Sequence, residues 1–181
     1  MKYIVLIICI LSYSVAITKG DVYKAYKNKN YKQACTDAAK IYLYNKKDET
    51  LLSVFANSCL KVDNINRMAF PAMLLVRSSA ARSNSIYFLT ILYQKKLLYK
   101  SLIDGYDVSK FKFPTTNYIL SKIFVMYADK MYTKSGSTYI FKDNKNKNIS
   151  YKLNISNTKG VYKMILRTFK NGVIIKTRIY W

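Results

Sequence analysis

The 181-residue sequence contains no histidine, a single glutamate and only nine acidic residues in all. Without histidine the chain lacks the usual general base at neutral pH, the commonest zinc ligand and the standard Ser-His-Asp hydrolytic triad. The one glutamate, Glu49, falls in a polar turn, and the five glycines are scattered, so no glycine-rich phosphate loop is present. We therefore expect a protein that is not an enzyme, with no catalytic residues, no cofactor and no metal ligands.

Long apolar runs are also missing beyond the N-terminus, because three lysines between positions 95 and 100 interrupt the best later candidate. At the start of the chain, Lys2 precedes the apolar run 3–11, and Ser14-Val15-Ala16 supplies small residues for cleavage. The run is shorter than the roughly 20 residues of a bilayer-spanning helix and typical of a secretory signal peptide. We predict a signal peptide over residues 1–16, cleaved after Ala16, and a periplasmic or secreted protein. The alternative is an uncleaved N-terminal anchor.

Positive charge is abundant, with 31 Lys and Arg residues against nine acidic ones and a net charge of +22. Such a charge attracts polyanions and anionic membrane surfaces. Lysine outnumbers arginine 26 to 5, and arginine is the residue suited to bidentate phosphate and guanine contacts, so the composition argues against a nucleic-acid partner. An A/T-rich gene would also enrich Lys, Asn, Ile and Tyr, which is the alternative explanation for the charge.

Two cysteines, Cys35 and Cys59, remain once the signal peptide is removed. Residues 31–44 and 51–60 each carry an apolar stripe at helical spacing, and the polar turn 45–49 lies between them. If the two helices fold back antiparallel around residue 47, each cysteine lies twelve residues from the turn and the two sit level. We predict a structural disulfide, as expected in an oxidising compartment. The alternative is two buried free thiols.

Helical periodicity continues through most of the chain. Helices are predicted over residues 21–27, 31–44, 50–61, 70–81, 85–103 and 116–132. Phe70-Pro71 is expected to begin the fourth, because proline is tolerated in a first helical turn. Ser83-Asn84-Ser85 can cap the fifth, and Asp104-Gly105 is a typical stop for it. The pattern predicts an antiparallel helical array over residues 17–135.

After Ser135-Gly136-Ser137 the period changes from helical to alternating, which is typical of strands. Two strands over residues 161–169 and 173–180 are joined across Asn171-Gly172, a tight-hairpin signature. We predict an antiparallel meander of about four strands over residues 136–181, packed on the last helix. The expected fold class is therefore α+β: an antiparallel helical-hairpin array followed by a small C-terminal antiparallel β-meander.

Residues 25–34 resemble the middle of a tetratricopeptide-type helical hairpin. Ala25-Tyr26 is followed by a short turn at Lys29-Asn30, then by Tyr31 and, three residues later, Ala34. The resemblance implies a TPR-like scaffold whose concave face takes a peptide or protein partner. We therefore expect an interaction protein whose partner is another envelope protein. The alternative is a peripheral protein whose basic surface binds anionic lipid or cell-wall polymer.

Overall fold

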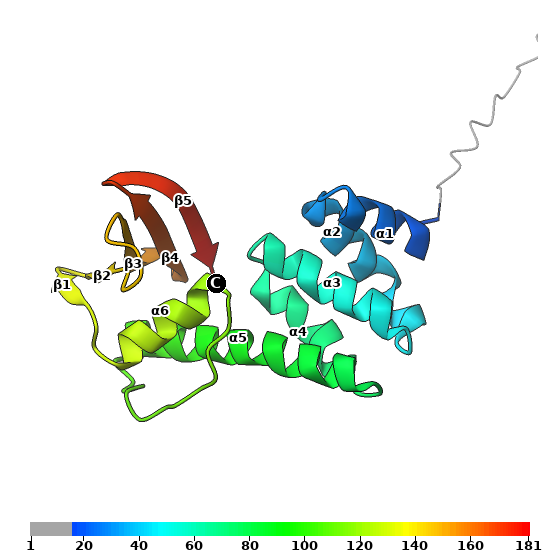
Figure 1. Ribbon diagram of the computed structural model, residues 1–181, viewed down its shortest axis with the longest axis horizontal. Coiled ribbons are helices and arrows are strands. Elements are labelled where there is room, and N and C mark those ends of the chain that lie inside the picture. The colour runs from blue at the N-terminus through cyan, green and yellow to red at the C-terminus, as the bar shows by residue number, and fades with distance from the viewer. Residues whose placement is uncertain (1–15) are drawn as a thin grey trace, which may run out of the picture.

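The computed structural model describes residues 16–181, so nearly all of the predicted signal peptide lies outside the described residues. Within this range six α-helices come first and a five-stranded antiparallel sheet follows (Figure 1). The fold class is α+β, as predicted. None of the helices in residues 16–181 has the length and apolar character needed to cross a membrane.

The first four helices form two hairpins. Helix α1 (Lys19–Lys27) pairs with α2 (Tyr31–Ile41), and α3 (Glu49–Lys61) pairs with α4 (Ile65–Leu74). A short 3₁₀ turn, η1 (Tyr42–Asn45), ends α2 earlier than predicted and leads into α3. The apolar stripes of α2 and α3 both contribute to the hydrophobic core, and buried side chains of α4 belong to the same core.

The two hairpins turn in the same way. Lys29 after α1 and Asp63 after α3 both adopt left-handed backbone, with φ of 59° and 61°. Asn30 and Asn64 follow and cap the next helices, each accepting a hydrogen bond from the backbone N–H three residues on. In both turns the N–H groups of the left-handed residue and of the asparagine bond back to the preceding helix, a Schellman arrangement. The equivalent positions lie 34 residues apart, so the chain repeats this turn once.

The start of α4 differs from the prediction. The helix begins at Ile65, because Asn64 caps it, and Pro71 therefore lies inside the helix and not in its first turn. A proline there removes the backbone hydrogen bond to the carbonyl of Arg67 and crowds that carbonyl with its ring. The helix ends at Leu74, less than one turn after the proline.

The longest helix, α5 (Ser79–Asp104), also begins earlier than predicted. Ser78, rather than residues 83–85, is its cap, because the Ser78 hydroxyl accepts a hydrogen bond from the N–H of Ala81 at 3.0 Å. The predicted stop is confirmed, since Gly105 has φ of 69° and ends the helix in left-handed backbone. Helix α5 runs beneath both the helical hairpins and the sheet (Figure 1).

The last helix is shorter than predicted and the sheet has one more strand. Helix α6 (Ile119–Ala128) ends before β1 (Thr133–Ser135), which pairs with β2 (Thr138–Lys142) around Gly136. The segment 135–137, read from the sequence as a boundary, therefore comprises the last residue of β1 and the hairpin turn Gly136-Ser137. A three-residue strand is too short to show alternation, which explains why the pattern missed β1.

The remaining strands are β3 (Ile149–Thr158), β4 (Val161–Lys170) and β5 (Val173–Tyr180), and the spatial order is β1-β2-β3-β4-β5. Asn171-Gly172 joins β4 to β5 as predicted, with positive φ at both residues, as a type I′ turn requires. A bulge at Thr168/Phe169 shifts the register between these strands.

One face of the sheet packs on the last two helices. The rings of Tyr127 in α6 and Tyr139 in β2 lie 5.1 Å apart. Lys122 of α6 forms an ion pair with the largely buried Asp143, which also accepts a hydrogen bond from the Tyr151 hydroxyl at 2.5 Å. Burial raises the pKa of the Asp143 carboxyl, but the hydrogen bonds from Lys122, Tyr151 and backbone N–H groups outweigh it and hold the pKa well below its usual range.

Candidate protein-binding cleft

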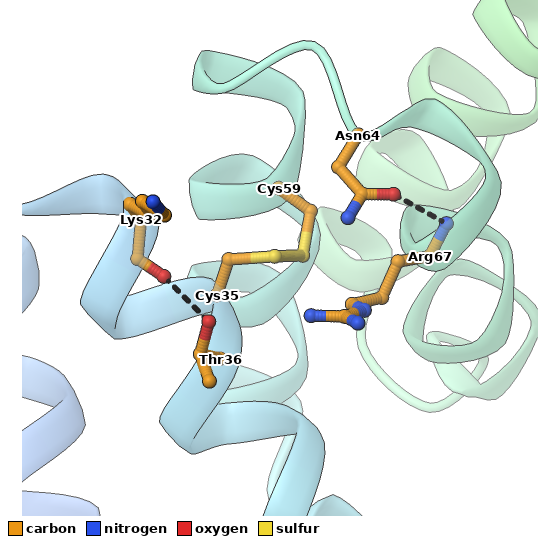
Figure 2. The surroundings of a disulfide bond; sticks show 6 residues. All are labelled: Lys32, Cys35, Thr36, Cys59, Asn64 and Arg67. Atoms are coloured by element: carbon orange, nitrogen blue, oxygen red, sulfur yellow. Dashed lines mark hydrogen bonds between the residues drawn. A yellow bond between two sulfur atoms is a disulfide. The ribbon is translucent and has the colours of Figure 1, made fainter.

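Cys35 and Cys59 form a disulfide that joins α2 to α3, the pairing that their spacing indicates (Figure 2). Their Cα atoms lie 4.9 Å apart, and both side chains are buried. A buried disulfide is shielded from exchange with external thiols and acts as a structural crosslink. Closing a loop of this size stabilises the fold by about 3 kcal/mol in the chain-entropy model.

A cavity of about 320 Å³ lies beside the disulfide. Three basic side chains line it: Lys32 of α2, Arg67 of α4 and Lys95 of α5. The end of β5, with Tyr180 and the following Trp181, lines it from the sheet. The cavity is therefore built jointly by the helical hairpins, by α5 and by the C-terminal strand.

A second cavity, of about 590 Å³, is lined by Lys61 at the end of α3 and by Lys176 and Arg178 of β5. Asp63 lines both cavities. We call the two cavities together the junction cleft. Counting both linings, six basic side chains stand against one acidic side chain, Asp63, so the cleft carries a strong positive potential.

A partly buried polar network joins residues that line the two cavities and ties the helical wall to β5. The Tyr118 hydroxyl donates to Asp63 Oδ1 at 2.5 Å and lies 3.1 Å from the Tyr180 hydroxyl. Arg178 Nε lies 3.3 Å from the same carboxylate oxygen. Burial, reinforced by the nearby Tyr180 and Asp63, raises the pKa of Tyr118 far above its usual value, and burial likewise raises the pKa of Tyr180. Both hydroxyls therefore stay protonated, and Asp63 is neutralised by Arg178.

Lys95 is the buried cation of the cleft, with only 2% of the residue exposed. Its Nζ donates to Asn66 Oδ1 at 2.8 Å and to the main-chain oxygen of Trp181. Burial, together with the neighbouring charge of Lys96, lowers the pKa of Lys95 to about 8. The ammonium group is therefore still mostly charged at neutral pH.

In the sequence, Lys95 stands out only as a charge that interrupts an apolar run. Its position on the helix carries a signal that this interpretation missed. Ile91 and Leu98, four residues before and three residues after it, are both fully buried, and residues at this spacing share one helix face. Helical periodicity thus places the lysine on the buried face of α5.

The chemistry available at the junction cleft comes from ammonium, guanidinium, amide and hydroxyl groups. Within residues 16–181, no three His, Cys, Asp or Glu side chains gather as metal ligands. Charged donors form short, strong hydrogen bonds with carboxylates. The cleft is therefore suited to holding anionic groups of a binding partner.

Comparison of the chain with protein-family models, with curated proteins and with solved structures finds no match. The tetratricopeptide-type resemblance of residues 25–34 stays a prediction. A function for the chain must be argued from the cleft, the sheet and the distribution of charge.

Proposed function

We propose that the protein is an exported, non-catalytic interaction protein, and that it binds an acidic segment of an envelope protein in the junction cleft. The observation that carries this proposal is the lining of the cleft, where six basic side chains stand against Asp63 alone. Arg178 already neutralises that carboxylate. Four of the remaining cations, Lys32, Lys61, Arg67 and Lys176, are exposed and form no ion pair within residues 16–181, so they are open to carboxylates of a partner.

The rigidity of the cleft walls supports a binding role. The Cys35–Cys59 disulfide fixes the helical wall, and the network of Asp63, Tyr118 and Tyr180 fixes that wall to β5. A preorganised site loses less conformational entropy when a partner binds. The turn repeated 34 residues apart also agrees with the TPR-like scaffold that the sequence resembles.

Export is part of the same proposal. The sequence pattern of residues 1–16 favours a cleaved signal peptide, and a disulfide is compatible with an oxidising compartment. Mass spectrometry of the protein from the periplasmic fraction should find Ile17 as its first residue. Recovery of a chain that retains residues 1–16 in the membrane fraction would favour the anchor alternative.

A second candidate function rests on the sheet. Residues 144–181 contain nine basic residues and no acidic residue. In the strand register, Lys142, Lys152 and Lys163 lie on the face opposite the buried side chains, and all three are exposed. This outer face favours peripheral binding to anionic lipid or cell-wall polymer.

Two triple variants with equal charge change separate the two candidates. The cleft variant carries Lys32→Glu, Lys61→Glu and Arg67→Glu. The sheet-face variant replaces Lys142, Lys152 and Lys163 by Glu. Each mature protein is immobilised and incubated with envelope extract at low and high salt, and bound material is identified by mass spectrometry. The cleft proposal predicts one discrete acidic protein that survives high salt, is retained by the sheet-face variant and is lost from the cleft variant.

The opposite pattern would support the second candidate. In that case wild type would recover only anionic lipid or polymer, because contacts made by exposed lysines are screened within about 10 Å at 0.1 M salt. Binding would vanish at high salt and from the sheet-face variant, while the cleft variant would bind as wild type does.

A further inference from the structure

The last strand, β5, is a long unprotected edge of the sheet. Only β4 pairs with it in the sheet, and its contacts with the helical region include Arg178 with Asp63 and Tyr180 with Tyr118, both near the end of the strand. An edge strand leaves alternate backbone N–H and C=O groups without partners in the sheet, a template for a further strand. The opposite edge, β1, has only three residues, whereas β5 has eight and contains no proline.

The free edge of β5 belongs to the junction cleft. Lys176 and Arg178 line the larger cavity, and Ile179 and Tyr180 line the smaller one. In Figure 1, β5 is the strand that faces the helical hairpins. A segment bound in the cleft would therefore lie beside unpaired main-chain groups as well as beside basic side chains.

Apolar side chains accompany these main-chain groups. Val173, Ile174 and Ile175 are each more than half exposed, and Ile179 is 43% exposed. Single exposed apolar residues are ordinary on protein surfaces, but here four of them fall within one strand of eight. The register places Ile174 and Ile179 opposite Phe169 and Ile165 on the outer face, whereas Lys176 and Arg178 lie on the other face. A partner strand with apolar residues at alternate positions would cover Ile174 and Ile179 and turn its intervening residues toward the cations.

Charge decides what can pair with this edge. A second copy of the chain aligned along β5 would bring further basic side chains next to Lys176 and Arg178, and no acidic residue follows Asp143 to balance them. Like charges on adjacent strands are destabilising, and edge lysines protect natural sheets against self-association. The same two cations would attract the carboxylates of an acidic strand.

We propose that β5 accepts an extended, acidic segment of the partner protein as a sixth strand of the sheet, so that main-chain pairing gives affinity and the exposed Lys176 selects for Glu or Asp. This inference rests on the proposed function, because it assumes a protein partner in the junction cleft. It goes further in naming the conformation and the chemistry of the bound segment.

A synthetic decapeptide of alternating Glu and Val serves as the probe, with an alternating Lys and Val decapeptide as the control. The mature protein is labelled with ¹⁵N, and binding and amide exchange are followed residue by residue. We expect the Glu peptide alone to bind, and to slow amide exchange at alternate residues of β5 at least tenfold. Equal binding of both peptides, or unchanged exchange along β5, would overturn the proposal.

Proline variants at two adjacent positions, Lys176→Pro and Thr177→Pro, give a second test. One of the two N–H groups points to β4 and the other to the free edge, because neighbouring residues of a strand bond to opposite sides. The variant that keeps the wild-type circular dichroism spectrum has lost an outward donor, and if it is Lys176→Pro, Lys176→Gln serves as the control for the lost charge. We expect this proline variant to bind the Glu peptide at least tenfold more weakly than wild type, and unchanged affinity would contradict strand addition.

The cleft variant, with Lys32, Lys61 and Arg67 changed to Glu, separates the two proposals. If the Glu peptide binds wild type, loses affinity for the cleft variant and leaves β5 exchange unchanged, strand addition is wrong and the cleft function stands. If the peptide perturbs neither wall of the cleft, both proposals are contradicted.

Discussion

The helical region and the sheet use their charges in different ways. The helical region holds most of the acidic side chains and places several of them at helix ends: Asp48 caps α3, and Glu49 accepts hydrogen bonds from the N–H groups of Arg77 and Ser78. Carboxylates at helix N-termini satisfy free donors and offset the helix dipole. Beyond Asp143 the sheet has no acidic residue, so its basic side chains have no carboxylate partners of their own.

This contrast indicates where binding energy is available. Several acidic residues in the helical region, among them Asp48 and Glu49, hold helix ends and turns, and the disulfide strengthens the same region. The cations of β5 face the cleft, where only Asp63 balances them. Stability is concentrated in the hairpins, and unsatisfied charge is concentrated where the sheet meets them.

Removal of the disulfide should weaken the helical region most. The double substitution Cys35→Ala and Cys59→Ala is expected to lower the free energy of unfolding by about 3 kcal/mol, because the unfolded chain regains loop entropy. Urea unfolding followed by circular dichroism measures the change. Wild type treated with a reductant in the unfolded state serves as the control and should refold to nearly the same reduced stability. An unchanged urea midpoint in the double variant would show that the crosslink does not stabilise the hairpins.

Loss of the Asp143 carboxylate should weaken the attachment of the sheet to α6. Asp143→Asn removes the ion pair with Lys122 and is expected to cost about 2 kcal/mol, because Lys122 and the Tyr151 hydroxyl lose a charged and largely buried acceptor. The matched control is Asp129→Asn, which breaks the exposed pair with Lys112 and should cost less than about 0.5 kcal/mol. Equal costs in urea unfolding would refute the assigned role of Asp143.

The same pair gives a pH dependence. The pKa of Asp143 is depressed in the folded protein. Its contribution to the free energy of unfolding is therefore fully present above its ordinary pKa of about 4, and this contribution is lost as pH falls through the lower pKa of the folded state. Wild type should therefore lose its advantage over Asp143→Asn as the solution is acidified below pH 4. An advantage that stays constant down to pH 2 would count against the depressed pKa.

Lys95 should show the opposite pH dependence. The pKa of Lys95 in the folded protein is about 8, below the usual 10.5. Between pH 8 and pH 10.5 the unfolded chain therefore keeps a proton on Lys95 that the folded protein has lost, and the free energy of unfolding of wild type rises with pH. Relative to Lys95→Met, wild type should gain about 1.4 kcal/mol between pH 7 and pH 9. Comparing the two proteins by urea unfolding at each pH cancels the titration of other groups, and a pH-independent difference would contradict the buried charge.

The smallest effect tests the repeated turn. Asn30→Ala and Asn64→Ala each remove a helix cap, and each should cost about 1 kcal/mol. The two costs should agree closely if the hairpins are equivalent. A cost confined to one of the two caps would break the equivalence.

Features set by chemistry within a few residues could be predicted from the sequence. The hairpin at Asn171-Gly172 and the helix stop at Gly105 follow from positive φ, and the spacing of Cys35 and Cys59 about one turn indicated their pairing. The early starts of α4 and α5 were missed, because Asn64 and Ser78 compete with other capping residues nearby. No feature of the neighbouring sequence distinguished Asn64 and Ser78 from these other capping residues.

The junction cleft could not be predicted, because distant segments build it. Tyr118 reaches Asp63 across 55 positions, and Lys95 reaches Trp181 across 86. No local pattern links these residues. Only the excess of positive charge, visible in the composition, indicated that an anionic partner was to be considered.

The most direct test of the account compares the affinity of the captured partner for the two triple variants at high salt. We predict at least a tenfold loss for the variant with Lys32, Lys61 and Arg67 changed to Glu, and less than a threefold loss for the variant with Lys142, Lys152 and Lys163 changed to Glu. A loss confined to the second variant would contradict binding in the junction cleft and assign the interaction to the outer face of the sheet.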